Sequence, residues 1–121
     1  MSHLILILVS VVLTSIGQLL FKKGMTVLDH QHQQASLWKL MGYGLFNEYV
    51  LLGFLSFGAG AILWLGVLAK EEVSYAYPLS GLGYIVVLLG SYLLFHEQFS
   101  LARIIGILLL IAGLFFIEYS H

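Results

Sequence analysis

The chain has 121 residues, of which 60% are hydrophobic and 9% are charged. Soluble domains carry about 25% charged residues, so this chain cannot cover a water-exposed surface and must have lipid as its main solvent. Its formal net charge of -1, with no basic stripe, argues against a nucleic-acid partner, and the absence of cysteine excludes disulfides and thiolate metal sites.

The first apolar segment predicts a transmembrane helix over residues 3–24. No lysine or arginine precedes its apolar core, whereas Lys22 and Lys23 follow it, which is the reverse of the order in a signal peptide. We therefore expect this segment to be retained as a helix.

The connection after this helix contains the most hydrophilic stretch of the chain, residues 29–36. Trp38, Lys39 and Tyr43 follow that stretch, and we expect them to lie as anchors at the depth of the lipid headgroups. This connection is predicted to be the longest in the chain.

Three further apolar segments predict transmembrane helices over residues 48–69, 74–95 and 101–119. Each segment has close to the ~20 residues that a helix needs to cross about 30 Å of hydrocarbon, and none alternates polar and apolar residues as a membrane strand does. The predicted fold class is an all-α membrane protein with four transmembrane helices, in a single domain over residues 1–121. An even number of crossings places both termini on one side of the membrane.

Basic residues favour one orientation only slightly. The first and third connections share one membrane face, and Lys70 alone lies on the other. Counted in full, the positive-inside rule places both termini outside, but two of the four lysines and arginines on the richer face also belong to a helix end. Both orientations therefore stay open. The residues on the richer face are Lys22, Lys23, Lys39 and Arg103.

Small residues mark faces where helices can approach closely, because helices in lipid associate through close van der Waals packing. Ser56 and Gly60 form such a pair in the second helix, and Gly106 and Gly113 lie seven residues apart on one face of the fourth. Packing within the chain and packing between two chains stay equally open. Four helices of this length cannot enclose a sizeable pathway, so a transport role requires a dimer.

Several short motifs carry a resemblance to a known family. A GQxxxK segment occupies residues 17–22, and AYP at 76–78 is followed by FHE at 95–97 and by RIIG at 103–106. Together they resemble the drug/metabolite transporter superfamily in its short, single-repeat form. The glycine pair of the fourth helix is similar to the dimerisation face of the small multidrug resistance transporters, and the resemblance implies their four-helix fold.

Within the superfamily, the resemblance is closest to the small subunits of the flippase for aminoarabinose linked to undecaprenyl phosphate. That subgroup has the GQxxxK segment, a Trp thirteen residues before the Tyr of AYP, and a His-Glu pair at the end of the third helix. In this chain the corresponding residues are Gln18, Lys22, Trp64, Tyr77, His96 and Glu97. The resemblance covers nearly the whole chain and is weak over residues 26–47.

The resemblance implies a multi-pass protein of the bacterial inner membrane that moves a polyprenyl-phosphate-linked sugar. It implies a homodimer, or a heterodimer with a homologous small subunit, held together through Gly106 and Gly113. No cofactor is implied. The sugar and the energy source cannot be inferred from these motifs.

One departure from the family pattern concerns proton coupling. The small multidrug resistance transporters place a glutamate three residues before the glycine that aligns with Gly17, and this chain has Thr14 there. The carboxylate that binds protons and cations in those exporters is therefore absent, which counts against a proton-coupled drug exporter.

The candidate substrate-binding residues on the first helix are Gln18 and Lys22. They lie four residues apart and so share one face. A lysine near a helix end also snorkels toward the headgroups without any substrate, so an anchoring role competes with phosphate binding.

The remaining candidate ligands are Trp64, Tyr77, Tyr84 and Glu97. A deep Trp either packs in the core or stacks on a sugar ring, and the tyrosines serve either as belt and interhelical residues or as substrate contacts. Glu97 is included because the resemblance includes it, whereas Arg103 is interpreted as an interfacial charge.

No motif supports an enzyme. The HxH pair His30 and His32 has no further ligand nearby, so no metal site is expected, and no catalytic triad or phosphate-binding glycine loop is present. Three functions stay open: a flippase subunit, a small multidrug or metabolite exporter, and a non-transporting assembly subunit. A polar and aromatic interior would favour transport, and an interior sealed by Leu and Ile would favour the assembly role.

Overall fold

A computed structural model describes residues 2–120, and the described part is helical with no strand. Four of its segments are long and apolar enough to cross a membrane: His3–Gln31, Glu48–Lys70, Val73–Phe95 and Leu101–Ser120. The predicted all-α class with four membrane-spanning helices is confirmed. The elements are α1 (Ser2–Gln31), α2 (Leu37–Gly44), α3 (Glu48–Lys70), α4 (Val73–Leu79), the 3-10 turn η1 (Ser80–Leu82), α5 (Gly83–Phe95) and α6 (Leu101–Ser120).

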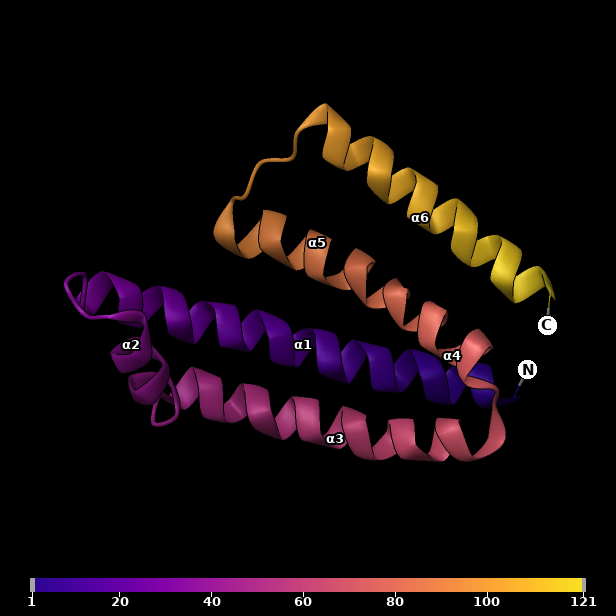
Figure 1. Cartoon of the computed structure of the whole chain (residues 1–121), viewed down its shortest axis with the longest axis horizontal. Coiled ribbons are helices and arrows are strands. Elements are labelled where there is room, and N and C mark those ends of the chain that lie inside the picture. Colours follow the sequence, from indigo (N-terminus) through magenta and orange to yellow (C-terminus); the bar gives the residue numbers. More distant parts are fainter. Residues whose placement is uncertain (1, 121) are drawn as a thin grey trace.

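Helices α1 and α3 form the main antiparallel pair (Figure 1). Two hydroxyls hydrogen-bond across the pair: Ser10 Oγ donates to the Gly60 carbonyl and Ser56 Oγ donates to the Leu13 carbonyl, both at 2.6 Å. A hydroxyl in a membrane interior must find such an acceptor, because lipid offers none. Ser56 and Gly60 therefore serve packing within the chain.

Glycines set the distance between these two helices. A Cβ atom on Gly53 would lie 2.9 Å from the Gly17 carbonyl oxygen, and one on Gly17 would lie 2.8 Å from the Gly53 carbonyl oxygen. Only hydrogen at both positions permits this approach. The neighbouring Phe21 ring packs edge-on against Phe54, with centroids 4.8 Å apart.

Helix α1 runs to Gln31, past the predicted end at residue 24. Its last turns are covered by α2, a short helix within the connection that was not predicted from the sequence. Leu28 is buried, and the His32 ring lies 4.5 Å from the Tyr43 ring. Trp38 is 79% exposed on α2, as suits an anchor at headgroup depth.

The third membrane span is broken into α4, η1 and α5. Pro78 lies inside α4 and has no backbone N–H, so it cannot bond the carbonyl four residues earlier, and the helix tightens into a 3-10 turn two residues later. Beyond the turn, a Cβ atom on Gly83 would lie 2.6 Å from Ser15 Oγ. The broken span is therefore pressed closely onto α1 at that point.

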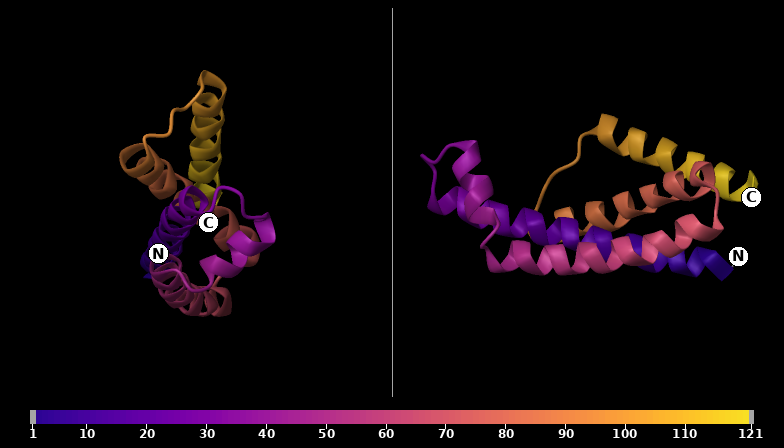
Figure 2. Two further views of the ribbon diagram at one scale, coloured as in Figure 1. Left: turned by 90° about the vertical axis from the view of Figure 1, so that its left-hand side faces the viewer. Right: turned by 60° about the horizontal axis from the view of Figure 1, so that its bottom comes forward.

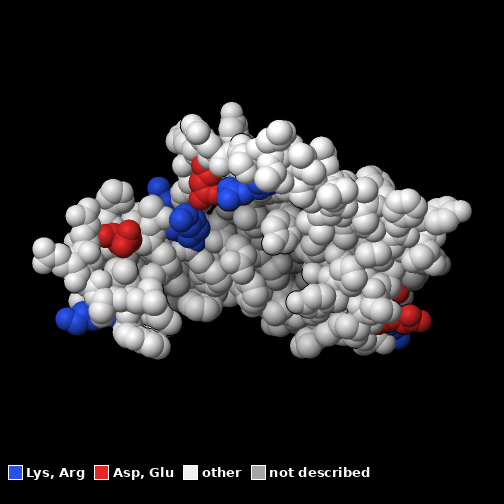
Figure 3. Space-filling view, turned by 45° about the horizontal axis from the view of Figure 1, so that its top comes forward, with Lys and Arg blue, Asp and Glu red and all other residues white. Residues whose placement is uncertain are grey.

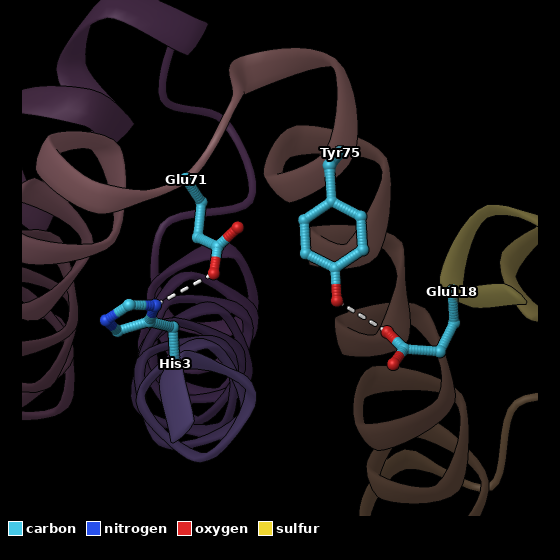
Figure 4. A network of polar contacts seen from close by, with 4 residues as sticks. All are labelled: His3, Glu71, Tyr75 and Glu118. Carbon is cyan, nitrogen blue, oxygen red and sulfur yellow. Dashed lines mark hydrogen bonds and ion pairs between the residues drawn. The ribbon is translucent and has the colours of Figure 1, made fainter. Parts of the chain in front are cut away.

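Polar contacts tie the helices together at the end of the molecule that carries both termini (Figures 1 and 4). His3 Nδ1 lies 2.9 Å from Glu71 Oε1, which joins α1 to the residue after α3. Tyr75 Oη donates to Glu118 Oε2 at 2.6 Å, which joins α4 to α6. Glu118 in α6 thus has a hydrogen-bonding role.

Helix α6 is the least covered of the four membrane spans (Figure 2). It packs on α4 and η1, and Leu114 is its one buried residue in the described chain. Large apolar side chains point outward here and elsewhere, for example Phe115 and Leu55, each 72% exposed. Surfaces of this kind are stable only in lipid, so the chain is a multi-pass membrane protein.

Candidate functional site

A pocket of about 700 Å³ lies between α1, α3 and the broken third span. Its volume falls within the range of roughly 300–1,000 Å³ that small-molecule sites occupy. Its walls combine hydroxyls, one amide and aromatic rings with a few apolar side chains. The lining residues are Ser10, Val11, Thr14, Ser15, Gln18, Phe57, Ala61, Trp64, Tyr77, Ser80, Gly83, Tyr84 and Val87.

A second pocket of about 430 Å³ adjoins the first and lies toward the connection between α5 and α6. The two pockets share Gln18, Tyr84 and Val87, so they form one continuous cleft along α1 and α5. The charged residues that line the second pocket are Lys22, Glu97 and Arg103. It is the charged end of the cleft, and the first pocket is its uncharged middle.

Helix α1 supplies a polar stripe along the whole cleft. Ser10, Thr14, Gln18 and Lys22 follow one another at intervals of four residues, and all four line one or both pockets. Residues four apart lie one above another on a helix, so the spacing itself predicts a polar face. Our interpretation of the sequence named only the last two members as ligands, used Thr14 only as the position of an absent carboxylate, and missed Ser10.

The hydroxyls at the deep end of the stripe have protein partners. Ser10 Oγ donates to the Gly60 carbonyl at 2.6 Å and Thr14 Oγ1 donates to the Val11 carbonyl at 3.0 Å. Each oxygen keeps a lone pair for a ligand. The Gln18 amide has no hydrogen-bond partner within the described chain, and it stands at the junction of the two pockets.

The charged end of the cleft is visible on the molecular surface (Figure 3). Basic and acidic side chains gather beside a hollow, and the wide face beyond them is uncharged up to the opposite end of the molecule. The Arg103 guanidinium stands over the Phe99 ring, 6.0 Å from its centroid. Lys23 points elsewhere, with its Nζ 5.9 Å from the Tyr49 ring on α3.

All six candidate substrate-binding residues line this cleft. Trp64 and Tyr77 line the first pocket, Lys22 and Glu97 line the second, and Gln18 and Tyr84 line both. Trp64 also packs against the hydrophobic core, whereas Tyr77 and Tyr84 are 67% and 61% exposed. Their role in binding a substrate stays a prediction.

Arg103, which was interpreted as an interfacial charge, also lines the second pocket with Lys22. No local pattern predicted that Lys22 and Arg103 lie close together, because they are 81 positions apart in the chain and only the packing of α6 against the bundle brings them to one pocket. Serines 15 and 80 were likewise missed, although both line the first pocket.

The candidate dimer residues lie on the uncovered helix. A Cβ atom on Gly106 or Gly113 would meet no heavy atom within 4 Å. By contrast, one on Gly81 would touch the Leu114 side chain. The first two glycines therefore serve no packing within this chain.

Carboxylates are scarce in the cleft. None lines the first pocket, where Thr14 stands at the position of the glutamate in the small multidrug resistance transporters, and Glu97 is the one carboxylate that lines the second pocket. Within residues 2–120, no group of three or more His, Cys, Asp or Glu side chains comes together to hold a metal ion. The arrangement offers hydrogen bonds, ring stacking and ionic contacts to a bound molecule.

A membrane helix bundle with a polar cleft of this kind, open at the side, belongs to the class of small membrane transporters. Residues 30–119 match the EamA-like transporter family, and the chain belongs to that family. No solved structure matches the chain.

Several named relatives align with nearly the whole chain. The chain is 35% identical over 113 residues to the probable 4-amino-4-deoxy-L-arabinose-phosphoundecaprenol flippase subunit ArnE of Aeromonas salmonicida, covering 93% of each protein. It is 33% identical over 124 residues to the probable subunit ArnF of the same flippase in Shewanella sediminis, covering 94% of this chain and 86% of the relative. The subunit ArnE of Pseudomonas aeruginosa is 31% identical over 108 residues, with 89% and 90% covered.

Proposed function

We propose that this chain is a subunit of a dimeric flippase of the bacterial inner membrane that moves a polyprenyl-phosphate-linked sugar. The observation that carries the proposal is the cleft itself: a basic pocket joined through Gln18 and Tyr84 to an aromatic, hydroxyl-rich pocket. The printed names of the ArnE and ArnF relatives point to the same class of cargo.

The polar stripe of α1 has a length that suits a crossing shared between two subunits. From Ser10 to Lys22 it rises by about 18 Å at 1.5 Å per residue, which is more than half of the ~30 Å hydrocarbon thickness. A second, oppositely oriented subunit would contribute the same stripe from the other membrane face. Such inverted pairs are the basis of alternating access in many transporters.

The two pockets fit the two polar parts of such a cargo. Lys22 lies near the membrane face where α3 begins and α5 ends, so its amine can meet a lipid phosphate at headgroup depth. Trp64, Tyr77 and Tyr84 offer ring faces and hydroxyls for a sugar in the deeper pocket. The prenyl chain would stay in the lipid outside the open side of the cleft.

The exposed glycine pair of α6 supports a dimer, because Gly106 and Gly113 have no packing partner within the chain. Two α6 helices could approach closely over hydrogen atoms at these positions. The partner is either a second copy or a homologous small subunit. The names ArnE and ArnF, which denote two kinds of subunit, favour the second arrangement.

Two other functions are less well supported. A proton-coupled exporter of cationic drugs would need a carboxylate at the centre of the cleft, where this chain has Thr14. A purely structural subunit would need no polar stripe over more than half of the hydrocarbon thickness, since polar groups in lipid are costly to keep without a function.

Flipping assays on three variants test the proposal. We expect Lys22→Ala and Trp64→Ala each to reduce flipping of a polyprenyl-phosphate glycoside in proteoliposomes, measured by its accessibility on the trans side. Lys22→Arg should retain partial activity, because the charge survives while its shape changes.

Lys23→Ala is the matched control, because Lys23 neighbours Lys22 but faces the Tyr49 ring. Lys22 is exposed, so its replacement should leave the fold intact, as helicity and elution volume would show. Wild-type flipping by a folded Lys22→Ala protein would return Lys22 to the class of interfacial anchors.

A further inference from the structure

We infer that the second pocket is a phosphodiester site, in which Lys22 and Arg103 bind the phosphate and Glu97 discriminates against phosphomonoesters. The inference rests on the proposed function only for the prenyl chain attached to the phosphate. Its charge argument comes from the pocket alone.

Two cations from opposite ends of the sequence reach one pocket. Lys22 comes from α1, and Arg103 comes from the first turn of α6. The backbone N–H of Arg103 donates to Ser100 Oγ at 3.2 Å. An ammonium and a guanidinium differ usefully: the first is a mobile point charge, and the second is a planar fork that can bind two phosphate oxygens at once. The Phe99 ring under the guanidinium limits its freedom and orients it.

Neither cation forms an ion pair within the described chain. No ion pair within residues 2–120 joins Lys22 or Arg103 to Glu97 or to any other carboxylate. Arg103 also lies in the first turn of a helix, where a cation is unfavourable because the amino end of a helix is already partly positive. Two such cations in one recess at headgroup depth favour the binding of an anion.

The formal charges of the pocket match one negative charge. Lys22 and Arg103 contribute two positive charges and Glu97 contributes one negative charge, which leaves a net charge of one.

A phosphodiester carries one negative charge and neutralises this pocket. A phosphomonoester carries about 1.5 to 2 negative charges at pH 7, so it loses more hydration on entry and leaves an excess charge beside Glu97. The pocket therefore favours the lipid that carries a sugar on its phosphate over the bare lipid phosphate. That preference would prevent futile movement of unloaded carrier by the proposed flippase.

The test measures binding with no sugar present. The purified protein in dodecyl maltoside is titrated with farnesyl methyl phosphate, a diester, and with farnesyl phosphate, a monoester. Lys22→Gln and Arg103→Gln are each expected to weaken diester binding about tenfold, the usual loss for one charge-assisted hydrogen bond. Lys23→Gln is the matched control, and it should bind as the wild type does, while neutral farnesol should bind all variants alike.

The decisive measurement is the ratio of the dissociation constant for farnesyl methyl phosphate to that for farnesyl phosphate. Glu97→Gln is expected to shift that ratio about tenfold toward the monoester, because it removes the charge that opposes the second negative charge of the ligand. Arg103→Lys should bind the diester more tightly than Arg103→Gln and less tightly than the wild type, because it keeps the charge and loses the planar fork.

Three results would overturn the inference: wild-type diester affinity in a helical, monodisperse Arg103→Gln protein, an unchanged ratio in Glu97→Gln, or equal competition by inorganic phosphate. The last result would mean a site for free anions. Binding that follows the expected pattern in a protein that flips no lipid-linked sugar would leave the phosphodiester site standing and remove the proposed function. If Arg103→Gln and Glu97→Gln both flip the sugar-lipid at the wild-type rate, the proposed function would stand and the phosphodiester site would be ruled out.

Discussion

Replacing Gly53 by alanine tests whether the α1–α3 contact organises the bundle. The new Cβ atom would lie 2.9 Å from the Gly17 carbonyl oxygen and 2.8 Å from Cδ1 of Phe21. The carbonyl belongs to helical backbone, and the Phe21 ring is packed against Phe54. Neither neighbour can move alone, so the two helices must separate.

The cost follows from that separation. Overpacking by one methyl group costs about 1–3 kcal/mol, and stretching the two interhelical bonds made by Ser10 and Ser56 adds up to about 1 kcal/mol at roughly 0.6 each. Alanine regains about 1 kcal/mol through its higher helix propensity. We expect a net loss of up to about 3 kcal/mol in the free energy of unfolding.

Gly58→Ala provides the control on the same helix, because a Cβ atom there meets nothing within 4 Å. Both variants are unfolded from mixed micelles with increasing SDS, and loss of helix is followed by circular dichroism. Gly58→Ala should unfold at the wild-type SDS fraction or above it, and Gly53→Ala well below. Coincident unfolding curves for the two variants would refute the view that close backbone contact holds α1 and α3 together.

Three further outcomes are expected. Gly113→Leu should weaken self-association, or association with a homologous subunit, measured by cross-linking in lipid, while Gly58→Leu should not; an intact dimer would mean that another face mediates assembly. Because Thr14 provides no carboxylate, adding a quaternary ammonium drug to the purified protein should release no protons, and release near neutral pH would favour the exporter function. Ser10→Ala should cost about 0.6 kcal/mol in the SDS assay, the mean value of such membrane hydrogen bonds, and no change would mean that the Gly60 carbonyl finds another donor.

Four transmembrane helices could be predicted from the sequence because a bilayer constrains each segment separately. A run of about 20 apolar residues must cross as a helix whatever its neighbours do, since lipid offers no partner for a free backbone group. The extension of α1 to Gln31 and the helix α2 were not predicted, because they depend on contacts between the two, such as His32 with Tyr43.

Those residues of the candidate site that lie on one helix could be predicted from their spacing in the sequence, whereas contacts between different helices could not. Gln18 and Lys22 lie on one turn of one helix, so their spacing alone puts them on one face. Ser10 and Thr14 continue the same spacing and could have been found by extending it. No local signal pointed to Arg103, which reaches Lys22 only through the return of the chain in α6.

The sequence by itself determined that this chain spans a membrane four times, and it determined which residue types are available for a polar path. Hydropathy and periodicity are properties of one continuous segment, so both can be read from consecutive residues. Tertiary structure alone decided that Trp64, Tyr77 and Tyr84 line one pocket and that Lys22, Glu97 and Arg103 line the next. The physical reason is that helix association in lipid depends on close packing and a few hydrogen bonds, whose partners lie on different helices far apart in the chain.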